Sequence, residues 1–350
     1  MRAVARKLAK KVAIPLTWQD DPLGQNFESA DIKTSDGAHV TLVRYSPGSE
    51  APGSEALVSG APHPVEAAVA PAPVAVLYVH GFSDYFFHPH VAEAFAKAGY
   101  AFYAVDLRGY GRSMDAHVAN GGDPNMVDEI ALHALDLDAA AKTLRELGHQ
   151  EIVVLAHSMG GLVSAMWAAN RPNQLKALIL NAPWFDLNEN WLLRGPSTAA
   201  IGALSKVAPK AVVGGLKPHY GKALHSSTGG QWDYNTTWKP HSGFPVQAAW
   251  LSSIRRAQAR LNAGLNIKVP VLVLSSTRSG SAKVWHPRLT STDSVLNVEH
   301  IAKGAAQLGR DVTFVQIADG AHDLALSATA QARDDYLAAT IGWLQQHVPA

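Results

Sequence analysis

The sequence predicts an α/β fold with a mostly parallel central sheet and helices on both of its faces. Near-continuous apolar runs of strand length alternate along the chain with segments of helical periodicity. Such runs are typical of strands that are buried on both faces, as in parallel sheets covered by helices. One run ends in a small residue, a histidine, a serine and a glycine pair. That ending indicates a functional turn between a strand and a helix.

The elements are predicted in chain order from these patterns. A hairpin is expected near residues 39–45, ahead of the main sheet. Strands are predicted at 74–79, 101–105, 152–156, 175–180, 271–274 and 312–317. Helices are predicted at 90–98, 125–147, 159–169, 295–308 and 334–347. In the longest helix the apolar residues from Val127 to Leu144 recur at intervals of three and four, and Gly148 is expected to end it.

We expect the chain to divide into five segments. They are an N-terminal segment with early strands (1–46), a flexible linker rich in Ala, Pro and Gly (47–73), the first part of the core (74–182), an inserted cap or lid (183–267) and the second part of the core (268–350). The inserted segment interrupts the strand and helix alternation and holds five of the nine tryptophans. An insertion at the carboxyl edge of the sheet would cover an active site.

Composition excludes several classes of protein. Thirty basic and 29 acidic residues leave a net charge of +1, so no overall field attracts nucleic acid. The chain has no cysteine, which excludes disulfides and thiolate metal sites and is compatible with a cytoplasmic location. The basic residues 1–11 precede an apolar run too short for a signal peptide, and no run is long enough for an integral membrane segment. The sequence is compatible with a homodimer.

The stretch from Ala156 to Gly161, Ala-His-Ser-Met-Gly-Gly, is typical of a nucleophile elbow. Ser158 would stand at a tight strand-to-helix turn with its hydroxyl projecting. Small residues are needed around it because the turn packs closely against neighbouring helices. The usual pattern begins with glycine, and alanine is the next smallest residue. The pattern therefore predicts Ser158 as a nucleophile.

Serine catalysis also needs a base and a group that orients the base. His322, one of 16 histidines, follows the last predicted strand in a loop that contains glycine. A carboxylate is expected directly after strand 271–274, but the residues there are Ser, Thr and Arg. Asp293 is the next candidate, although it could instead cap the helix predicted after it. The alternatives for the acid are Glu299, Asp311 and Asp186.

The oxyanion of the reaction needs backbone donors. The N–H of Met159, directly after the nucleophile, is one candidate. The N–H of Phe82, in the loop after strand 74–79, is the other, and Gly81 permits the turn that would aim it inward. His80 is expected to stabilise this loop. His157 is expected to point away from Ser158 and to have a structural role.

Five motifs occur in the order and spacing of a known family: His80-Gly81, Asp106-Leu-Arg-Gly-Tyr-Gly-Arg-Ser113, Ala-His-Ser-Met-Gly-Gly161, Asp-Ser-Val-Leu296 and Gly-Ala-His322. Together they resemble the α/β-hydrolase superfamily, in its monoacylglycerol lipase and lysophospholipase-like branch, which is also grouped with serine aminopeptidases. The resemblance covers about residues 41–347. It implies an α/β-hydrolase fold with Ser158 as nucleophile, Asp293 as acid, His322 as base, and Phe82 and Met159 as oxyanion amides. Ala156 and the long spacing before Asp293 depart from the family pattern.

The sequence thus predicts a serine hydrolase that cleaves carboxylic esters through an acyl-enzyme. Tyr85, Phe86, Trp184 and Trp191 are expected to line a cleft for a small-molecule ester with an apolar portion. Such a reaction needs neither a metal nor an organic cofactor.

Several alternatives share the same residues. An aminopeptidase or amidase would need an acidic clamp, for which the inserted segment offers Asp186, Glu189 and Asp233. An acyltransferase would exclude water from the acyl-enzyme. A non-catalytic binding protein on this fold typically lacks the serine, the histidine or the acid. A dehalogenase or epoxide hydrolase would need aspartate at position 158.

Overall fold

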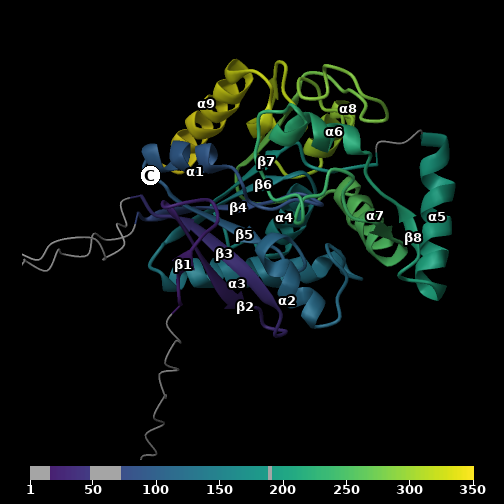
Figure 1. Ribbon diagram of the computed structural model, residues 1–350. Helices are drawn as coiled ribbons and strands as arrows, with labels where there is room; N and C mark the ends of the chain where they lie inside the picture. Colours follow the sequence, from purple (N-terminus) through teal and green to yellow (C-terminus); the bar gives the residue numbers. More distant parts are fainter. Residues whose placement is uncertain (1–15, 48–71, 188–190) are drawn as a thin grey trace, which may run out of the picture.

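A computed structural model describes residues 16–47, 72–187 and 191–350, without the side chains of 191–197 (Figure 1). Nearly all of the predicted linker at 47–73, and the basic residues 1–11, lie outside the described residues. Among the helices that are described, none is long and apolar enough to cross a membrane.

The described strands form one nine-stranded sheet and a separate two-stranded sheet. The large sheet has the order β1-β2-β3-β5-β4-β6-β7-β10-β11. Its strands are β1 (Gln19–Asp20), β2 (Phe27–Lys33), β3 (His39–Tyr45), β4 (Val74–Val79), β5 (Ala101–Asp106), β6 (Glu151–His157), β7 (Ala177–Asn181), β10 (Val271–Ser276) and β11 (Val312–Ile317). The strands from β5 to β11 in this order pair in parallel, and β1, β2 and β3 pair antiparallel. The predicted mostly parallel sheet is confirmed.

Helices cover both faces of this sheet, as predicted. Alternate residues of the central strand β4 enter two different hydrophobic clusters because successive side chains of a strand point to opposite faces. One cluster includes residues of α3 (His133–Glu146), α4 (Ser158–Asn170), α7 (Ala248–Asn262) and α8 (Val298–Ala305). The other includes residues of α1 (Pro89–Lys97) and α9 (Ala330–His347), which lie together on the opposite side of the sheet from α3 in Figure 1.

The helix predicted at 125–147 begins later in the structure than its apolar pattern indicates. A 3₁₀ turn at Ile130–Leu132 precedes α3, which begins at His133. Asn125 has a left-handed φ of 62°, and its backbone and side-chain N–H groups both donate to the carbonyl of Gly109. The side chains of Val127, in a loop, and Ile130, in the 3₁₀ turn, are therefore buried although neither residue belongs to an α-helix. Periodicity alone does not distinguish such residues from those of a helix.

The segment between β7 and β10 contains α5 (Trp191–Val207), β8 (Val212–Gly214), α6 (Pro218–Leu224), β9 (Val246–Gln247) and then α7. Strands β8 and β9 pair only with each other. Helix α7 packs in the main core through Trp250, Ile254 and Leu261. The boundaries of the inserted segment at 183 and 267 stay a prediction. Helix α7 lies within these boundaries but packs in the core layer.

The shorter helices connect these elements. They are α2 (Met114–Ala119) and the 3₁₀ turns Gly111–Ser113, Ser226–Thr228 and Leu324–Leu326. The last of these turns begins two residues after His322. The loops that carry the candidate site residues therefore leave the sheet at the carboxyl ends of β4, β6, β10 and β11, where parallel α/β sheets place their ligand sites.

Candidate active site

Ser158 stands at a sharp turn between β6 and α4. Its φ of 52° is left-handed, a conformation that is uncommon for residues other than glycine. A Cβ atom at Gly160 would lie 2.3 Å from the carbonyl oxygen of His80, and one at Gly161 would lie 2.7 Å from Pro183 Cβ. Both positions therefore require glycine. This is the geometry of a nucleophile elbow, in which close packing holds the serine in a strained conformation.

His322 connects Ser158 to Asp293. Its Nε2 lies 3.0 Å from Ser158 Oγ, and its Nδ1 lies 3.0 Å from Oδ1 and 3.1 Å from Oδ2 of Asp293. All three side chains are buried, and Asp293 has no exposed surface. With the ring proton on Nδ1, His322 donates to the carboxylate and accepts from the serine hydroxyl. The three residues that the sequence predicted as a triad therefore lie in one hydrogen-bonded line.

A closed excursion of the chain explains the long spacing before Asp293. Strand β10 continues to Ser276, and Ser279 then lies beside Asp293 in an isolated parallel bridge. The N–H of Asp293 donates to the carbonyl of Arg278, and the N–H of Gly280 donates to the carbonyl of Asp293. Residues 280–292 thus leave the end of β10 and return to it. The excursion therefore brings Asp293 beside Ser279, three residues after the end of β10.

Asp293 is not the N-cap of the following helix. Helix α8 begins at Val298, and Asn297 caps it by accepting from the N–H of Glu299. Asp293 Oδ1 instead accepts from the N–H groups of Val295 and Leu296, which hold the carboxylate in place as it faces His322. The alternative acids lie elsewhere: Glu299 and Asp311 are exposed, and Asp186 pairs with Arg255.

The loop after β4 approaches Ser158 closely. A Cβ atom at Gly81 would lie 3.1 Å from Ser158 Cβ and 3.2 Å from His157 Cδ2. Phe82 lines the same cavity as Ser158, and its ring lies 4.6 Å from that of Trp250. Met159 occupies the first turn of α4, where backbone N–H groups have no partner within the helix. The two amides expected to bind an oxyanion therefore belong to the segments that meet at Ser158.

His80 supports this loop, in agreement with its expected role. Its Nδ1 donates to the carbonyl of Gly81, and its Nε2 accepts from the N–H of Leu107 at the end of β5. Because the ring is fully buried, burial lowers the pKa of His80. The neutral ring can make both of these bonds, whereas a protonated ring could not accept the second.

His157 was expected to point away from Ser158, and this was wrong. Its ring lines the same cavity and lies 4.8 Å from the ring of His322. The left-handed turn at Ser158 ends the strand's alternation, so neighbouring side chains need not point to opposite sides. Its Nδ1 donates to the carbonyl of Asn181, and burial lowers the pKa of His157 to about 4. His157 is therefore neutral near pH 7.

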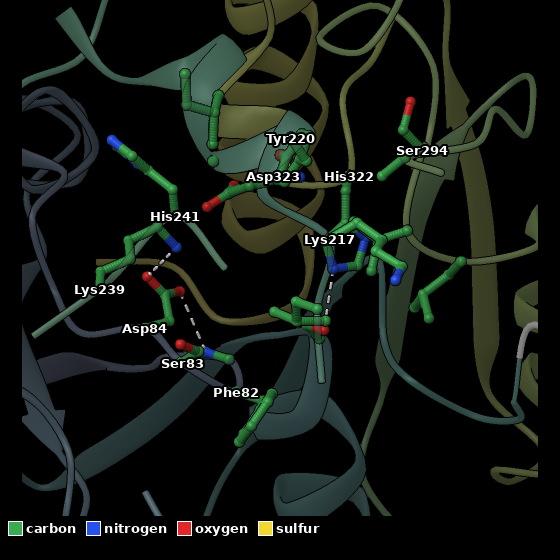
Figure 2. A pocket seen from close by; sticks show the side chains of 18 of the residues that line it. Phe82, Ser83, Asp84, Lys217, Tyr220, Lys239, His241, Ser294, His322 and Asp323 are labelled. Atoms are coloured by element: carbon green, nitrogen blue, oxygen red, sulfur yellow. Dashed lines mark hydrogen bonds and ion pairs between the residues drawn. The ribbon is translucent and has the colours of Figure 1, made fainter. Parts of the chain in front are cut away.

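The site opens into a cavity of about 370 Å³. Apolar side chains form one part of its wall, with Phe82, Trp184, Leu187, Leu216, Val295 and Leu296 among them. Charged and polar side chains form another part and include Asp84, Tyr220, Lys239, His241 and Asp323 (Figure 2). The cavity is large enough for a small organic molecule.

Two of the four residues expected to contact substrate do not line this cavity. Phe86 is fully buried, and its ring packs against those of Tyr78 and Phe102 in the core. The hydroxyl of Tyr85 accepts from the N–H of Asn235, so its ring supports the overlying segment. Trp184 lines the cavity as expected, and the side chain of Trp191 lies outside the described residues.

Comparison with known proteins decides the family. A family model described as serine aminopeptidase, S33, matches residues 70–325, which is most of the chain. The chain belongs to this family of α/β hydrolases. A crystal structure of monoacylglycerol lipase from Paleococcus ferrophilus has the same fold, with a TM-score of 0.60 and 19% identity over 79% of this chain and 96% of that one.

Curated relatives match the hydrolase over shorter stretches. Monoacylglycerol lipase from Mycolicibacterium smegmatis is 31% identical over 145 residues, 38% of this chain and 45% of that protein. Putative esterase/lipase 2 from Mycoplasma pneumoniae is 31% identical over 109 residues, 31% of this chain and 37% of that protein. The aligned part therefore spans less than half the length of each of these relatives.

Sequence reasoning missed the charged wall of the hydrolase's cavity. Asp84 Oδ1 lies 2.7 Å from Lys239 Nζ, and Asp323 Oδ2 lies 2.9 Å from His88 Nε2. Asp84, His157 and Asp323 also offer ligand atoms within 4.8 Å of one another, a set that could contact a metal ion. Asp84 is already balanced by the ammonium of Lys239. Asp84 stands three residues after the His80-Gly81 motif, but no local pattern marks Lys239 as its partner.

Proposed function

We propose that this α/β hydrolase is a serine hydrolase that cleaves small carboxylic esters. The observation that carries the proposal is the hydrogen-bonded line from Asp293 through His322 to Ser158, with 3.0 Å between atoms at each step, at the wall of a cavity. A buried carboxylate that holds the imidazole in one tautomer, with the other nitrogen on a serine hydroxyl, is the arrangement that activates a serine.

The reaction would proceed in two steps. His322 Nε2 takes the proton of Ser158 as Oγ bonds to the ester carbonyl carbon, and the carbonyl π electrons move to its oxygen. The N–H groups of Phe82 and Met159 stabilise that oxyanion, for which one donor is typically worth roughly 3 kcal/mol. The oxyanion then collapses, the ester C–O bond breaks, and the alcohol leaves with the proton from His322. Water then gives a proton to the same nitrogen as its oxygen bonds to the acyl carbon. The second oxyanion collapses, the bond from the acyl carbon to Ser158 Oγ breaks, and Oγ takes the proton back from His322 as the carboxylic acid leaves.

The cavity favours an ester with an apolar portion. Phe82 and Trp184 offer aromatic surface beside the nucleophile, and Leu296 lies on the same wall. Burial of one such apolar group stabilises a complex by roughly 25 cal/mol per Å². The names of the curated relatives, a monoacylglycerol lipase and an esterase/lipase, support the same substrate class.

An aminopeptidase is the second candidate because the matching family model carries that description. The ammonium of a peptide substrate would need a carboxylate within the cavity. Asp84 and Asp323 line the cavity, but the first is paired with Lys239 and the second with His88 and Asn181. Both carboxylates already have partners, which favours an ester over a peptide with a free amino terminus.

Labelling by a fluorophosphonate probe tests the proposal. We expect the wild type to be labelled, Ser158→Ala to lose labelling, and His322→Ala and Asp293→Asn to react at least 100-fold more slowly, since the triad acts as a unit. Turnover of p-nitrophenyl esters of graded chain length would then report the size of the apolar part of the cavity. Glu299→Gln is the matched control for Asp293→Asn, because Glu299 is an exposed carboxylate near it in the chain.

Three outcomes would contradict parts of the proposal. A wild type that neither reacts with the probe nor turns over any ester would point to a binding role. Hydrolysis of aminoacyl amides at a higher kcat/KM than the esters would favour the aminopeptidase. Normal turnover by Asp293→Asn, with loss of turnover in Glu299→Gln, would show that the acid is misplaced.

A further inference from the structure

The loop that carries Phe82 is held in a strained conformation. Ser83, between Phe82 and Asp84, has a left-handed φ of 54° and is buried. A residue other than glycine adopts this conformation only where the surrounding structure enforces it. The direction of the Phe82 N–H depends on the neighbouring dihedral angles. Contacts that hold residues 81–84 therefore also hold this proposed oxyanion donor.

Asp84 is the side chain that holds the loop from within. Its Oδ2 accepts from the N–H of Gly81 at 3.3 Å, which closes a turn around Phe82 and Ser83. The residue is only 2% exposed. Burial by itself would raise the pKa of Asp84, but the charge of Lys239, with lesser effects of nearby histidines, outweighs it and the pKa is lowered. The carboxylate is therefore charged, and it needs a cation.

Lys239 supplies that cation from a different part of the chain, 155 positions away. Its Nζ lies 2.7 Å from Asp84 Oδ1, and its side chain is 16% exposed. The ammonium also lies 5.4 Å from the ring centre of Phe87 and 5.8 Å from that of Tyr234. The lysine belongs to residues 208–247, which lie between α5 and α7 in the chain.

The same 208–247 segment contacts both loops that flank Ser158. Asn235 N–H donates to Tyr85 Oη at 2.7 Å, directly after Asp84. Tyr220 Oη accepts from the N–H of Asp323 at 3.0 Å, directly after His322. Of these contacts, the Asp84–Lys239 pair joins two charged side chains, and its carboxylate is buried. An unpaired buried carboxylate is far more costly than a lost exposed contact.

We propose that Lys239 is a positioning residue that holds the oxyanion loop through Asp84, so that the loop is competent only while the 208–247 segment is docked. The proposal rests on the proposed function, because it takes the Phe82 amide as an oxyanion donor. Among the described residues, Lys239 Nζ pairs with Asp84, and no hydrogen bond joins it to Ser158 or His322. It acts on the reaction through Asp84 and the turn at Gly81.

Steady-state ester hydrolysis by Lys239→Met tests this role. We expect kcat to fall about 10- to 100-fold, a decrease no larger than that caused by removal of one oxyanion donor. KM should stay within about threefold of the wild-type value. Lys239→Arg keeps the cation and should recover most of the lost kcat. Lys210→Met is the matched control: Lys210 lies in the same segment and pairs with Asp123 at 3.0 Å, but both side chains are exposed. Its kcat should match the wild type.

The double variant Asp84→Asn/Lys239→Met separates positioning from loss of stability. If Lys239→Met is harmful because it leaves a buried charge unpaired, then neutralising that charge should raise kcat above that of Lys239→Met alone. Melting temperatures of all variants would be measured alongside. A double variant that is no better than Lys239→Met, or a Lys239→Met that changes KM and not kcat, would overturn the proposal.

Hydrogen exchange distinguishes failure of this proposal from failure of the proposed function. Backbone amides of residues 80–85 should exchange faster in Lys239→Met than in the wild type, and Lys210→Met should leave their exchange unchanged. This readout does not depend on any substrate. If the wild type hydrolysed no ester but exchange rose in Lys239→Met, the proposed function would fail while Lys239 would still hold the loop. Unchanged exchange in Lys239→Met would remove Lys239 from that role.

Discussion

At the scale of single residues, His157 shows how burial sets protonation beside Ser158. Its ring lies 4.8 Å from the ring of His322 and donates to the carbonyl of Asn181. A second positive charge next to His322 would oppose protonation of that residue during the reaction. Burial keeps His157 neutral, since its pKa is lowered to about 4. His157 is thus compatible with a base at His322.

This pKa predicts how stability depends on pH. An unfolded histidine has a pKa of about 6.5, whereas folded His157 takes up a proton only near pH 4. Between these values the unfolded chain binds more protons, so the free energy of unfolding falls as the pH is lowered from about 6.5 to 4. Urea unfolding at pH 7 and pH 5 should show a smaller pH dependence for His157→Asn, which retains a donor for Asn181. Equal pH dependence in both proteins would contradict the prediction.

At the scale of elements, the turn from β6 to α4 depends on the absence of side chains. The carbonyl oxygen of His80 lies only 2.3 Å from where a Cβ atom of residue 160 would be, so the loop after β4 and helix α4 can approach this closely only at glycine. The contact is between backbone atoms, which cannot move aside as a flexible side chain can. Gly342, in α9, has nothing within 4 Å of the corresponding position. Position 160 therefore has no room for a side chain, whereas position 342 does.

Alanine substitutions should separate these two glycines. We expect Gly160→Ala to lower the free energy of unfolding by about 1–3 kcal/mol through overpacking and to reduce ester turnover. Gly342→Ala should raise stability by roughly 0.5–1 kcal/mol, because alanine has the higher helix propensity. Thermal unfolding of both variants beside the wild type measures the difference. A Gly160→Ala protein as stable and active as the wild type would show that this contact is looser than the structure indicates.

At the scale of the whole molecule, Arg112 joins three parts of the chain. Its guanidinium pairs with Asp21 near the N-terminal hairpin and with Asp106 at the end of β5. Both carboxylates are fully buried, and Asp106 also accepts from the N–H of Phe86. Arg112 belongs to the Asp106–Ser113 motif, whose Ser113 Oγ accepts from the N–H of Thr41 in β3. The motif therefore attaches the antiparallel edge of the sheet to its parallel part.

Loss of Arg112 should destabilise the whole fold. Arg112→Met would leave two buried carboxylates without their cation, and breaking such a pair typically costs about 3–5 kcal/mol. Lys142→Met is the control, since Lys142 pairs with Glu146 on an exposed helix face and such pairs contribute about 0.3–0.5 kcal/mol. Denaturant unfolding of both variants measures the contrast. Similar losses in the two variants would mean that Arg112 contributes no more than a surface charge.

Much of this architecture could be predicted because it follows from local patterns. Strands β4 and β11 have the predicted bounds, since apolar runs and turn residues mark them. The hairpin expected near residues 39–45 is longer, because β3 fills those residues and pairs with β2 before it. Gly160 and Gly161 mark the elbow because only small residues fit there, and the loop after the last strand singles out His322. The prediction that Tyr85 and Phe86 line the cavity was wrong. The sequence around an aromatic residue in such a loop is the same whether its ring faces a cavity or the core.

Contacts between distant residues decided the rest. Nothing near Asp293 shows that residues 280–292 leave β10 and return to it, which required the bridge between Ser279 and Asp293. His157 entered the cavity because a left-handed residue follows it. Lys239 reached Asp84 across 155 positions because residues 235–243 pack against the loop after β4. Composition and periodicity specify which faces are buried, whereas the partner of a buried charge depends on how those faces pack together.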